Sequence, residues 1–340
     1  MIDTPIFIGG IERSGTSLVR AIIGSHPEVA IYEWDLQLWT RYFNQYKNLD
    51  LRKSDNLDNL INVIFNDKKV RNCDIRMDKM NVKQRIFERL CHGITIGFVF
   101  QCFLEEYAIA VNKPRWGLKT PYNEFFADDI FNAYPNARMV QIIRDPRDVA
   151  VSFQSYNDGA WSFQPLKHIA SWQESVFISL RNEKKYKGRY ITITYEQLVR
   201  EPEQVTRKVC DILDLDYTPV MLDTNGHLGW NGSNSFFDDI GRQSNSIKTS
   251  AIGRYQTQLQ PHLVYLYQKR LRTQLKHMGY NIKEFNYRSK VIINIMLLRQ
   301  KMLQPMKHFL SGIATRSVEM LRNTPIFVPA RTLYRKLLKL

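Results

Sequence analysis

The sequence predicts an α/β protein built on a mainly parallel β-sheet with helices on both faces. Short apolar runs of strand length alternate along the chain with longer segments of helical periodicity, the order that a parallel sheet requires. Polar residues directly follow several of these runs, at the positions where open α/β sheets bind ligands. The 340 residues, 44% of them hydrophobic, suffice for one large domain or two smaller ones.

The first predicted unit is a strand, a turn and a helix within the first 24 residues. Residues 5–10 read Pro-Ile-Phe-Ile-Gly-Gly, a short apolar run bounded by Pro and Gly that is typical of a buried strand. Residues 10–17 form a compact turn bounded by glycine. The apolar spacing over residues 18–22 then predicts a helix that ends near Gly24.

This turn has the composition of a phosphate-binding loop. Glycines let the backbone approach an anion, and the N-terminus of the following helix adds its N–H groups and its positive dipole end. Gly10 and Gly15, with four residues between them, match a Walker-type loop up to the position of its lysine. Thr16 stands at that position, and the cation lies inside the turn at Arg13. We therefore interpret the turn as a phosphate loop without its lysine.

Residues 32–112 show helical signals and little strand character. We interpret them as a helical insertion that forms part of the acceptor site. The longest apolar stretch of the chain, residues 93–111, lies in this insertion and is interrupted by Gln101, Glu105 and Glu106. Those interruptions favour a buried amphipathic helix over a membrane span.

Three further strands are predicted after the insertion, each followed by helical signals: residues 115–119, 138–143 and 189–194. After the second of them, Asp145 is placed as an N-cap and Pro146 at the first helical position. Four polar side chains end or follow the predicted strands: Arg13, Lys119, Arg144 and Tyr195. Since the carboxyl ends of parallel strands meet at one edge of a sheet, we expect these four to converge.

The last part of the predicted globular unit is irregular and then helical. Residues 222–258 are polar and rich in glycine, which indicates a long surface loop of the functional or disordered kind. A helix over residues 261–278 should complete the unit. We therefore expect a domain over 1–285 and a basic helical extension over 286–340.

The positive charge of the chain is concentrated in this extension. The whole chain carries 48 Lys and Arg against 33 Asp and Glu, and residues 287–340 alone hold eleven basic residues and one acidic residue. Basic and apolar residues are mixed there as in interfacial helices, so we expect a tether to an anionic inner membrane surface. The alternative is packing on the body of the protein or on a second subunit, in a homodimer. Nucleic acid is not an expected partner, because no aromatic-interleaved basic patch accompanies the charge.

The cysteine and histidine content points to an intracellular protein without a structural metal. Cys73, Cys91, Cys102 and Cys210 lie far apart and form no C-x-x-C pair, so we expect reduced core residues. The seven histidines show no metal-ligand spacing. The first strand begins by residue 5, which leaves no room for a signal peptide, so the expected location is the cytoplasm.

A phosphate loop without lysine restricts the chemistry. Kinases and NTPases use that lysine on the β- and γ-phosphates and hold Mg²⁺ with a loop hydroxyl and a carboxylate. Thr16 at the lysine position weakens this interpretation. A sulfuryl donor fits better, because the transferred group carries less charge than a phosphoryl group. Side-chain cations and backbone N–H groups could then stabilise the transition state without a metal.

Four segments in one order carry a family resemblance: IFIGGIERSGTSLVRAIIGSHPEV, WGLKTP, IIRDPRDVAVS and YITITYEQLVREPE. Together they make the chain resemble sulfotransferases that use 3′-phosphoadenosine 5′-phosphosulfate (PAPS). Within that superfamily it is most similar to the tyrosylprotein sulfotransferase and related bacterial branch. The resemblance covers roughly residues 5–280 and implies a P-loop-type α/β fold.

The resemblance also implies roles for individual residues. The donor's 5′-phosphosulfate would be bound by Arg13, Ser14, Gly15, Thr16 and Ser17, with Arg13 stabilising charge on the bridging oxygen. The 3′-phosphate would be held by Arg144 and Ser152, and Tyr195 would lie near the adenosine-phosphate end. Lys119 would face the sulfuryl group, and Ser244, Lys248 and Arg254 would close over the cofactor.

The expected general base is Glu33, which would take the proton of the acceptor hydroxyl. The tyrosylprotein pattern has two adjacent glutamates here, whereas this chain reads Glu33-Trp34-Asp35. A strict count places Trp34 opposite the glutamate that usually has the base role. Asp35 is the second choice.

The expected function is transfer of the PAPS sulfuryl group to an acceptor hydroxyl, with no metal required. Peptide tyrosine, a carbohydrate or glycolipid, and a small molecule all remain open as acceptors. Two other classes compete with this expectation. One is a P-loop kinase or NTPase, and the other is a non-catalytic nucleotide-binding protein that anchors an assembly at a membrane.

Overall fold

The computed structural model describes residues 1–89, 93–156, 164–223, 247, 249–286, 290, 291 and 294. The chain divides into two compact units. The first consists of Met1–Leu259 with Leu271–Tyr280, and the second of Gln260–Arg270 with Asn281–Leu340. The first unit holds the sheet and all residues of the candidate site. Most of the expected basic extension lies outside the described residues.

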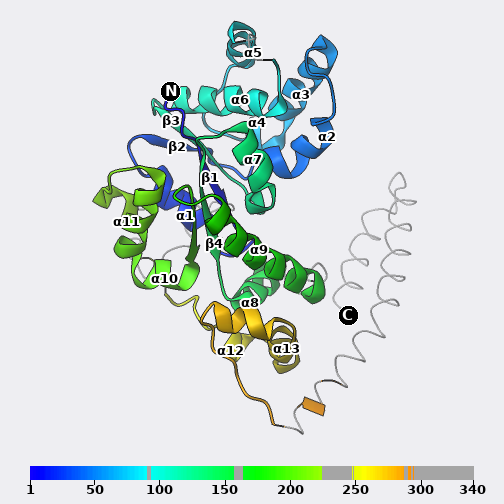
Figure 1. Cartoon of the computed structure of the whole chain (residues 1–340), viewed down its shortest axis with the longest axis vertical. Coiled ribbons are helices and arrows are strands. Elements are labelled where there is room, and N and C mark those ends of the chain that lie inside the picture. Colours follow the sequence, from blue (N-terminus) through cyan, green and yellow to red (C-terminus); the bar gives the residue numbers. More distant parts are fainter. Residues whose placement is uncertain are drawn as a thin grey trace, which may run out of the picture. The chain divides into compact units, whose positions relative to one another are not determined.

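The first unit is built on a five-stranded, wholly parallel sheet (Figure 1). Its strands in spatial order are β2 (Val29–Ile31), β3 (Arg115–Lys119), β1 (Ile6–Gly9), β4 (Arg138–Ile143) and β5 (Tyr190–Thr194). In the register, Phe7 of β1 stands opposite Leu118 of β3 and Met139 of β4. The parallel α/β fold predicted from the sequence is confirmed, together with four of its five strands.

The strand that the sequence did not reveal is β2, at one edge of the sheet. Its three residues follow Pro27 and Glu28 and lie immediately before the expected insertion. A run this short carries too little periodicity to be separated from a helical segment. Pairing with β3, where Ile31 stands opposite Gly117, decides its conformation.

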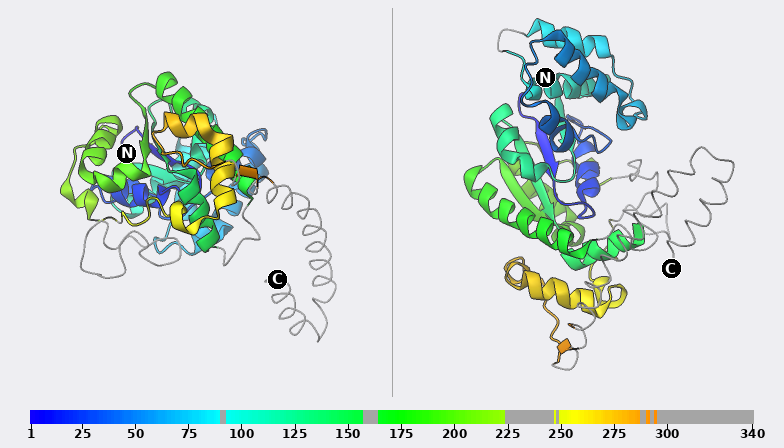
Figure 2. Two further views of the ribbon diagram at one scale, coloured as in Figure 1. Left: turned by 90° about the horizontal axis from the view of Figure 1, so that it is seen from below. Right: turned by 90° about the vertical axis from the view of Figure 1, so that its right-hand side faces the viewer.

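Alternate residues of the strands feed two hydrophobic clusters, one on each face of the sheet. Phe7 and Met139 belong to one cluster, whereas Ile6, Ile8 and Val140 belong to the other. Successive side chains of a strand point to opposite faces, so both faces must be covered. Figure 2 shows helices on both sides of the sheet.

The helices that cover the sheet come from different parts of the chain. On the first face, α6 (Ile96–Ala110) packs against β2 and β3, and α9 (Pro165–Lys185) packs against β4 and β5. On the second face, α1 (Thr16–Gly24) packs against β1 to β3, and α11 (Pro202–Leu213) packs against β4 and β5.

The predicted helical insertion is present between β2 and β3. It contains η1 (Leu38–Phe43), α2 (Asn44–Tyr46), α3 (Ser54–Asn66), α4 (Lys68–Arg71), α5 (Lys79–Glu88) and α6. The apolar stretch that we expected to be a buried helix is α6, which contributes Phe100 and Phe103 to the first cluster. Among the described residues, no helix is long and apolar enough to span a membrane.

Helices also follow the remaining strands. The 3₁₀-helix η3 (Asn123–Phe126) and α7 (Ala127–Ala133) follow β3, α8 (Pro146–Tyr156) follows β4, and α10 (Tyr195–Arg200) follows β5. Further along lie η4 (Pro219–Leu222), α12 (Tyr255–Gln258) and α13 (Pro261–His277). Of the long loop expected over residues 222–258, the positions 224–246 and 248 lie outside the described residues.

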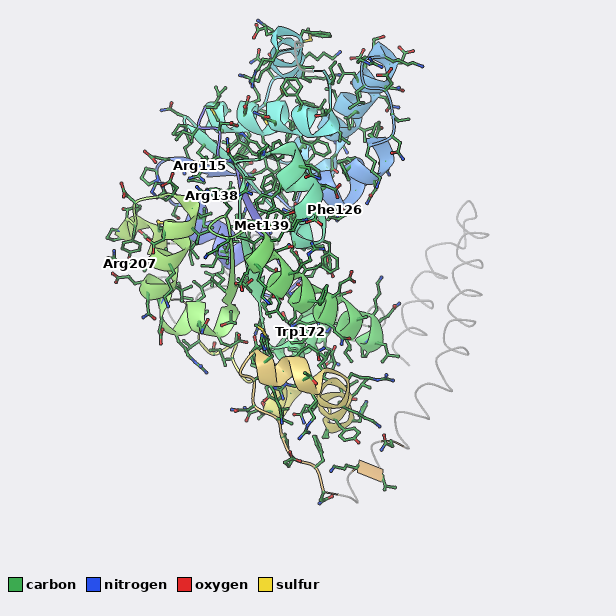
Figure 3. All side chains as sticks on the ribbon, viewed as in Figure 1. Arg115, Phe126, Arg138, Met139, Trp172 and Arg207 are labelled. Atoms are coloured by element: carbon green, nitrogen blue, oxygen red, sulfur yellow. The ribbon has the colours of Figure 1, made fainter. Side chains whose placement is uncertain are left out.

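Two arginines mark the edge of the sheet at which the strands begin. Arg115 and Arg138 are the first residues of β3 and β4 (Figure 3). The backbone N–H of Arg138 donates to the carbonyl of Pro5, just before β1, at 2.9 Å. The candidate site lies at the opposite edge, where the strands end.

Candidate functional site

The turn between β1 and α1 has the backbone conformation that its glycines predict. Gly10 and Gly15 have φ angles of +139° and +101°, and Arg13 has a φ of +67°. A Cβ at Gly10 would lie 2.5 Å from the carbonyl oxygen of Ile142, and one at Gly15 would lie 2.7 Å from the Tyr195 ring. Only glycine allows the turn to pass this close to β4 and Tyr195. The turn then delivers the chain into the N-terminus of α1, an arrangement suited to binding an anion.

The cations predicted to meet at this edge do so. The Arg13 Nε donates to Ser152 Oγ at 3.0 Å, and the Arg144 guanidinium donates to the Arg13 carbonyl at 3.2 Å. The same guanidinium lies 4.3 Å from the centre of the Tyr195 ring and donates to the Ala251 carbonyl at 2.6 Å. Residues from four separate parts of the chain thus surround one end of the turn.

Helix α8 holds part of the late loop beside these arginines. Asp145 caps α8 by accepting from the Arg147 N–H at 2.9 Å, and its carboxylate also pairs with the Arg147 guanidinium at 2.7 Å. Asp148 accepts from the backbone N–H groups of Gly253 and Tyr255 at 2.6 and 2.8 Å. These two bonds fix the position of Arg254, which lies between their donors in the sequence.

Arg254 and Arg144 bring two positive charges close together. Burial lowers the pKa of Arg254, and the neighbouring charge of Arg144 lowers it further. Within the described part of the chain, the Nε atoms of both arginines are buried and have no hydrogen-bond partner. The same holds for the hydroxyl of Ser14 in the turn. Buried donors are normally satisfied, so this set is fitted to receive an anion.

Lys119 lies on the other side of the turn, at the carboxyl end of β3. The residue is only 2% exposed, and burial lowers the pKa of its ammonium group. Its Nζ donates to Ser17 Oγ at 3.2 Å and forms an ion pair with the Asp35 carboxylate. The structure therefore joins Lys119 to the start of α1, as the sequence predicts, and adds Asp35 as its partner.

Glu33 has different surroundings from Asp35. Its carboxylate accepts from the Trp34 indole N–H at 2.9 Å and from the Asp74 backbone N–H at 3.2 Å. It also lies within hydrogen-bonding range of the Cys73 thiol, whose pKa burial raises to about 12. These donors belong to residue 34 itself and to the segment between α4 and α5, and not to the turn that holds Arg13.

Sequence reasoning missed two cations near this centre. Arg20 of α1 donates to the Glu33 carbonyl, and Lys69 of α4 donates to the Asp35 carbonyl. Both hold the backbone of residues 33–35 in place. Arg20 carried no sequence signal because it stands within the apolar stripe of a helix. Lys69 is one of several basic residues of the insertion, and only the fold selects it.

Two predicted residues of the late loop cannot be placed, because Ser244 and Lys248 lie outside the described residues. Arg254 lies inside them and beside Arg144, as described above. Thr16 and Ser17 are the first two residues of α1, and Ser152 is the seventh residue of α8, where it accepts from Arg13. Over the described ranges, no group of three or more His, Cys, Asp or Glu side chains could hold a metal ion.

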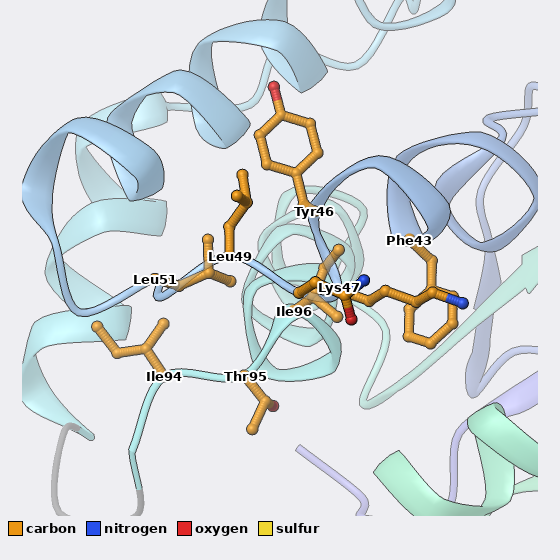
Figure 4. A pocket seen from close by; sticks show the side chains of 9 residues that line it. Phe43, Tyr46, Lys47, Leu49, Leu51, Ile94, Thr95 and Ile96 are labelled. Carbon is orange, nitrogen blue, oxygen red and sulfur yellow. The ribbon is translucent and has the colours of Figure 1, made fainter.

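The insertion also contains a pocket of about 410 Å³ (Figure 4). Its walls come from the end of η1, from α2 and the segment after it, and from the start of α6. They include Phe43, Tyr46, Leu51 and Ile96, with Lys47 at the side. Polar and apolar groups contribute about equally to its lining, and the pocket belongs to the insertion rather than to the edge of the sheet.

Comparison with known proteins agrees with this arrangement. The profile of the sulfotransferase family matches residues 5–219, which include β1 to β5 and every described site residue except Arg254. The chain belongs to the sulfotransferase family. The matched range begins at the strand before the phosphate loop and continues through α11, so the family's fold accounts for the whole sheet.

Individual sulfotransferases are only distantly similar. The chain is 26% identical to protein-tyrosine sulfotransferase A of Caenorhabditis elegans over 225 residues, which are 64% of this chain and 51% of that protein. It is 22% identical to the Drosophila melanogaster protein-tyrosine sulfotransferase over 227 residues, again 64% of this chain but 39% of that one. The chain thus spans about half or less of the length of these relatives.

A solved structure shares the fold of this sulfotransferase. The sulfotransferase domain from the curacin biosynthetic pathway matches with a TM-score of 0.53 and 20% identity. The match covers 83% of this chain and 99% of that domain. The two chains therefore have the same architecture.

Proposed function

We propose that this chain transfers the sulfuryl group of PAPS to the hydroxyl group of an acceptor. The observation that carries the proposal is the set of buried donors without partners at one edge of the sheet: Ser14 Oγ, Arg144 Nε and Arg254 Nε. They belong to a glycine turn and two arginines beside an aromatic ring, which suits a nucleotide with phosphate groups at two positions.

The two phosphate positions of PAPS correspond to two parts of the site. The turn at Arg13–Ser17 would hold the 5′-phosphosulfate, with its N–H groups and the Arg13 guanidinium directed to charge that develops on the bridging oxygen. Arg144, Arg254 and Ser152 would hold the 3′-phosphate, with Tyr195 beside the adenosine. Lys119 would neutralise charge on the sulfuryl group. These cations supply the electrostatic stabilisation that a metal supplies in kinases, and we propose that transfer requires no metal.

We propose that the acceptor is a molecule with a hydroxyl group that fits beside the helical insertion between β2 and β3. The tyrosine sulfotransferases among the relatives support peptide tyrosine as the first acceptor to test. Glycans and phenols follow, because both present a hydroxyl that can attack sulfur. A kinase reaction has less support, since Thr16 stands where the lysine of a kinase loop would be.

The test is transfer of radiolabel from ³⁵S-PAPS to tyrosine peptides, glycans and simple phenols, with and without EDTA. We expect labelled product that EDTA does not abolish. Arg13→Ala should lower the transfer rate by about 100- to 1,000-fold, because it removes one donor from the developing charge. Arg207→Ala is the matched control, since Arg207 lies on α11 and pairs with Glu203, away from the site (Figure 3).

Two results would contradict the proposal. One is a purified chain that binds neither PAPS nor its product 3′-phosphoadenosine 5′-phosphate (PAP). The other is an Arg13→Ala variant that transfers sulfate at the rate of the Arg207→Ala control.

A further inference from the structure

The sequence around residue 33 offers two carboxylates that could take the acceptor proton. From their surroundings we infer that Asp35, and not Glu33, is the general base of this sulfotransferase. The inference rests on the proposed sulfuryl transfer and assigns a catalytic residue within that site. Trp34, which stands between the two, has no basic group.

Glu33 is already engaged in a structural network. Its Oε1 accepts from both the Trp34 indole and the Asp74 backbone, and the Cys73 thiol is a third neighbour within hydrogen-bonding range. Hydrogen bonds from the protein to this oxygen occupy lone pairs that an acceptor hydroxyl would need. The donors that surround it tie residue 33 to the segment between α4 and α5.

Asp35 is joined to the predicted reaction centre through Lys119. The Asp35 carboxylate pairs with the Lys119 ammonium, which in turn donates to Ser17 Oγ of the phosphate loop at 3.2 Å. A single side chain thus separates the carboxylate from the loop that would bind the phosphosulfate. Glu33 has no comparable path among the interactions of the described residues.

The exposure of the pair matches the two roles. The Lys119 side chain is 3% exposed, whereas the Asp35 side chain is 24% exposed. Lys119 is therefore buried against the donor loop, whereas the Asp35 side chain is partly exposed to solvent.

The backbone of residues 33–36 is held by side chains from three parts of the chain. Arg20 of α1 donates to the Glu33 carbonyl, and Lys69 of α4 donates to the Asp35 carbonyl. The hydroxyl of Thr120, next to Lys119, donates to the Leu36 carbonyl at 2.8 Å. A base held by its neighbours in this way is preorganised for proton transfer.

The proposed step conserves atoms and charge. Asp35 takes the hydroxyl proton of the acceptor while the acceptor oxygen forms a bond to sulfur. The bond between sulfur and the bridging oxygen breaks, and its electron pair stays on the 5′-phosphate of PAP. Lys119 and Arg13 stabilise the charge on the oxygens, and protonated Asp35 then releases its proton to solvent.

The experiment compares two carboxylate-to-amide variants that stand two residues apart. With the acceptor identified by the ³⁵S assay, Asp35→Asn should lower kcat by about 100- to 10,000-fold, the usual contribution of a general base. Glu33→Gln should stay close to wild type, because the amide oxygen can still accept from Trp34 and Asp74. PAP affinity, measured by calorimetry, should be retained in both variants.

A second measurement separates a base from a positioning residue. The defect of Asp35→Asn should shrink when phenol is replaced by the more acidic 4-nitrophenol, which loses its proton without help. A structural defect would lower the rates of both phenols equally.

The inference is overturned if Glu33→Gln loses kcat while Asp35→Asn does not. It is also overturned if the Asp35→Asn defect is the same for both phenols. A wild-type chain that binds no PAP contradicts the proposed function itself, so the two failures can be told apart.

Discussion

At the scale of single residues, the site depends on the closeness of two arginines, Arg144 and Arg254. The terminal nitrogens of Arg144 donate hydrogen bonds to the carbonyls of Arg13 and Ala251, and its guanidinium group packs against the Tyr195 ring. Its Nε is buried without a partner in the described structure. A phosphate between Arg144 and Arg254 would satisfy that atom and offset the repulsion of the two guanidinium groups.

Arg144→Ala should therefore weaken the binding of PAP by about 10- to 100-fold, the value of a charged hydrogen bond. The binding of 5′-AMP, which has no 3′-phosphate, should change little. Isothermal titration with both nucleotides measures the difference. An equal loss for PAP and 5′-AMP would show that Arg144 does not bind the 3′-phosphate.

At the scale of elements, Glu124 of η3 links the phosphate loop to α9. Its carboxylate accepts from the Gly10 N–H at 2.7 Å and from the Ser175 hydroxyl at 2.8 Å. The residue is fully buried, and burial raises its pKa to about 7. A Cβ at Gly9 would come within 2.8 Å of Glu124, so Glu124 packs directly against the end of β1 and the start of the phosphate loop.

The raised pKa of Glu124 predicts a pH-dependent stability. In the unfolded chain the group ionises near its ordinary value of 4.5, whereas in the folded chain it stays protonated up to about pH 7. Its favourable contribution is therefore complete below pH 4.5 and is lost as the pH rises to 7. Over this window wild type should lose about 3 kcal/mol of unfolding free energy relative to Glu124→Gln.

Urea unfolding of both proteins at pH 5 and pH 8 checks this value. Glu174→Gln, on an exposed position of α9, is the control and should follow the wild-type pH dependence. A constant difference between wild type and Glu124→Gln across the two pH values would contradict the assignment.

At the scale of the whole molecule, the distribution of positive charge indicates where in the cell the protein acts. Residues 287–340 carry most of the net charge of +15, and their mixture of basic and apolar residues is typical of segments that bind membrane surfaces. We propose that this extension tethers the sulfotransferase to an anionic cytoplasmic membrane surface. Packing of the extension on a second subunit, in a homodimer, remains the alternative prediction from the sequence.

The full chain should sediment with vesicles that contain phosphatidylserine and not with vesicles of phosphatidylcholine alone. Salt of about 1 M, where the Debye length is about 3 Å, should release it. Replacing Arg331, Arg335, Lys336 and Lys339 by Gln should weaken vesicle binding and leave PAP binding unchanged. If the chain binds both kinds of vesicle equally well and high salt does not release it, the electrostatic tether is ruled out.

Much of the fold could be predicted because its signals are local. The strand, turn and helix that open the chain lie within 24 residues, and each is specified by its own apolar pattern and glycines. The predicted insertion and the strands β3, β4 and β5 carry similar signals. The short strand β2 does not, because its conformation depends on pairing with β3, far along the sequence.

The sequence by itself determined which residues meet at the edge of the sheet that we propose binds the donor. Arg13, Arg144 and Tyr195 each follow a strand and Lys119 ends one, and parallel strands bring their carboxyl ends to one edge whatever else the chain does. The proposed general base rests only on the tertiary structure. Glu33 and Asp35 are two residues apart and chemically alike, and nothing local distinguishes them. Contacts with Cys73 and Asp74 on one side, and with Lys119 on the other, come from distant segments and give each carboxylate its own environment.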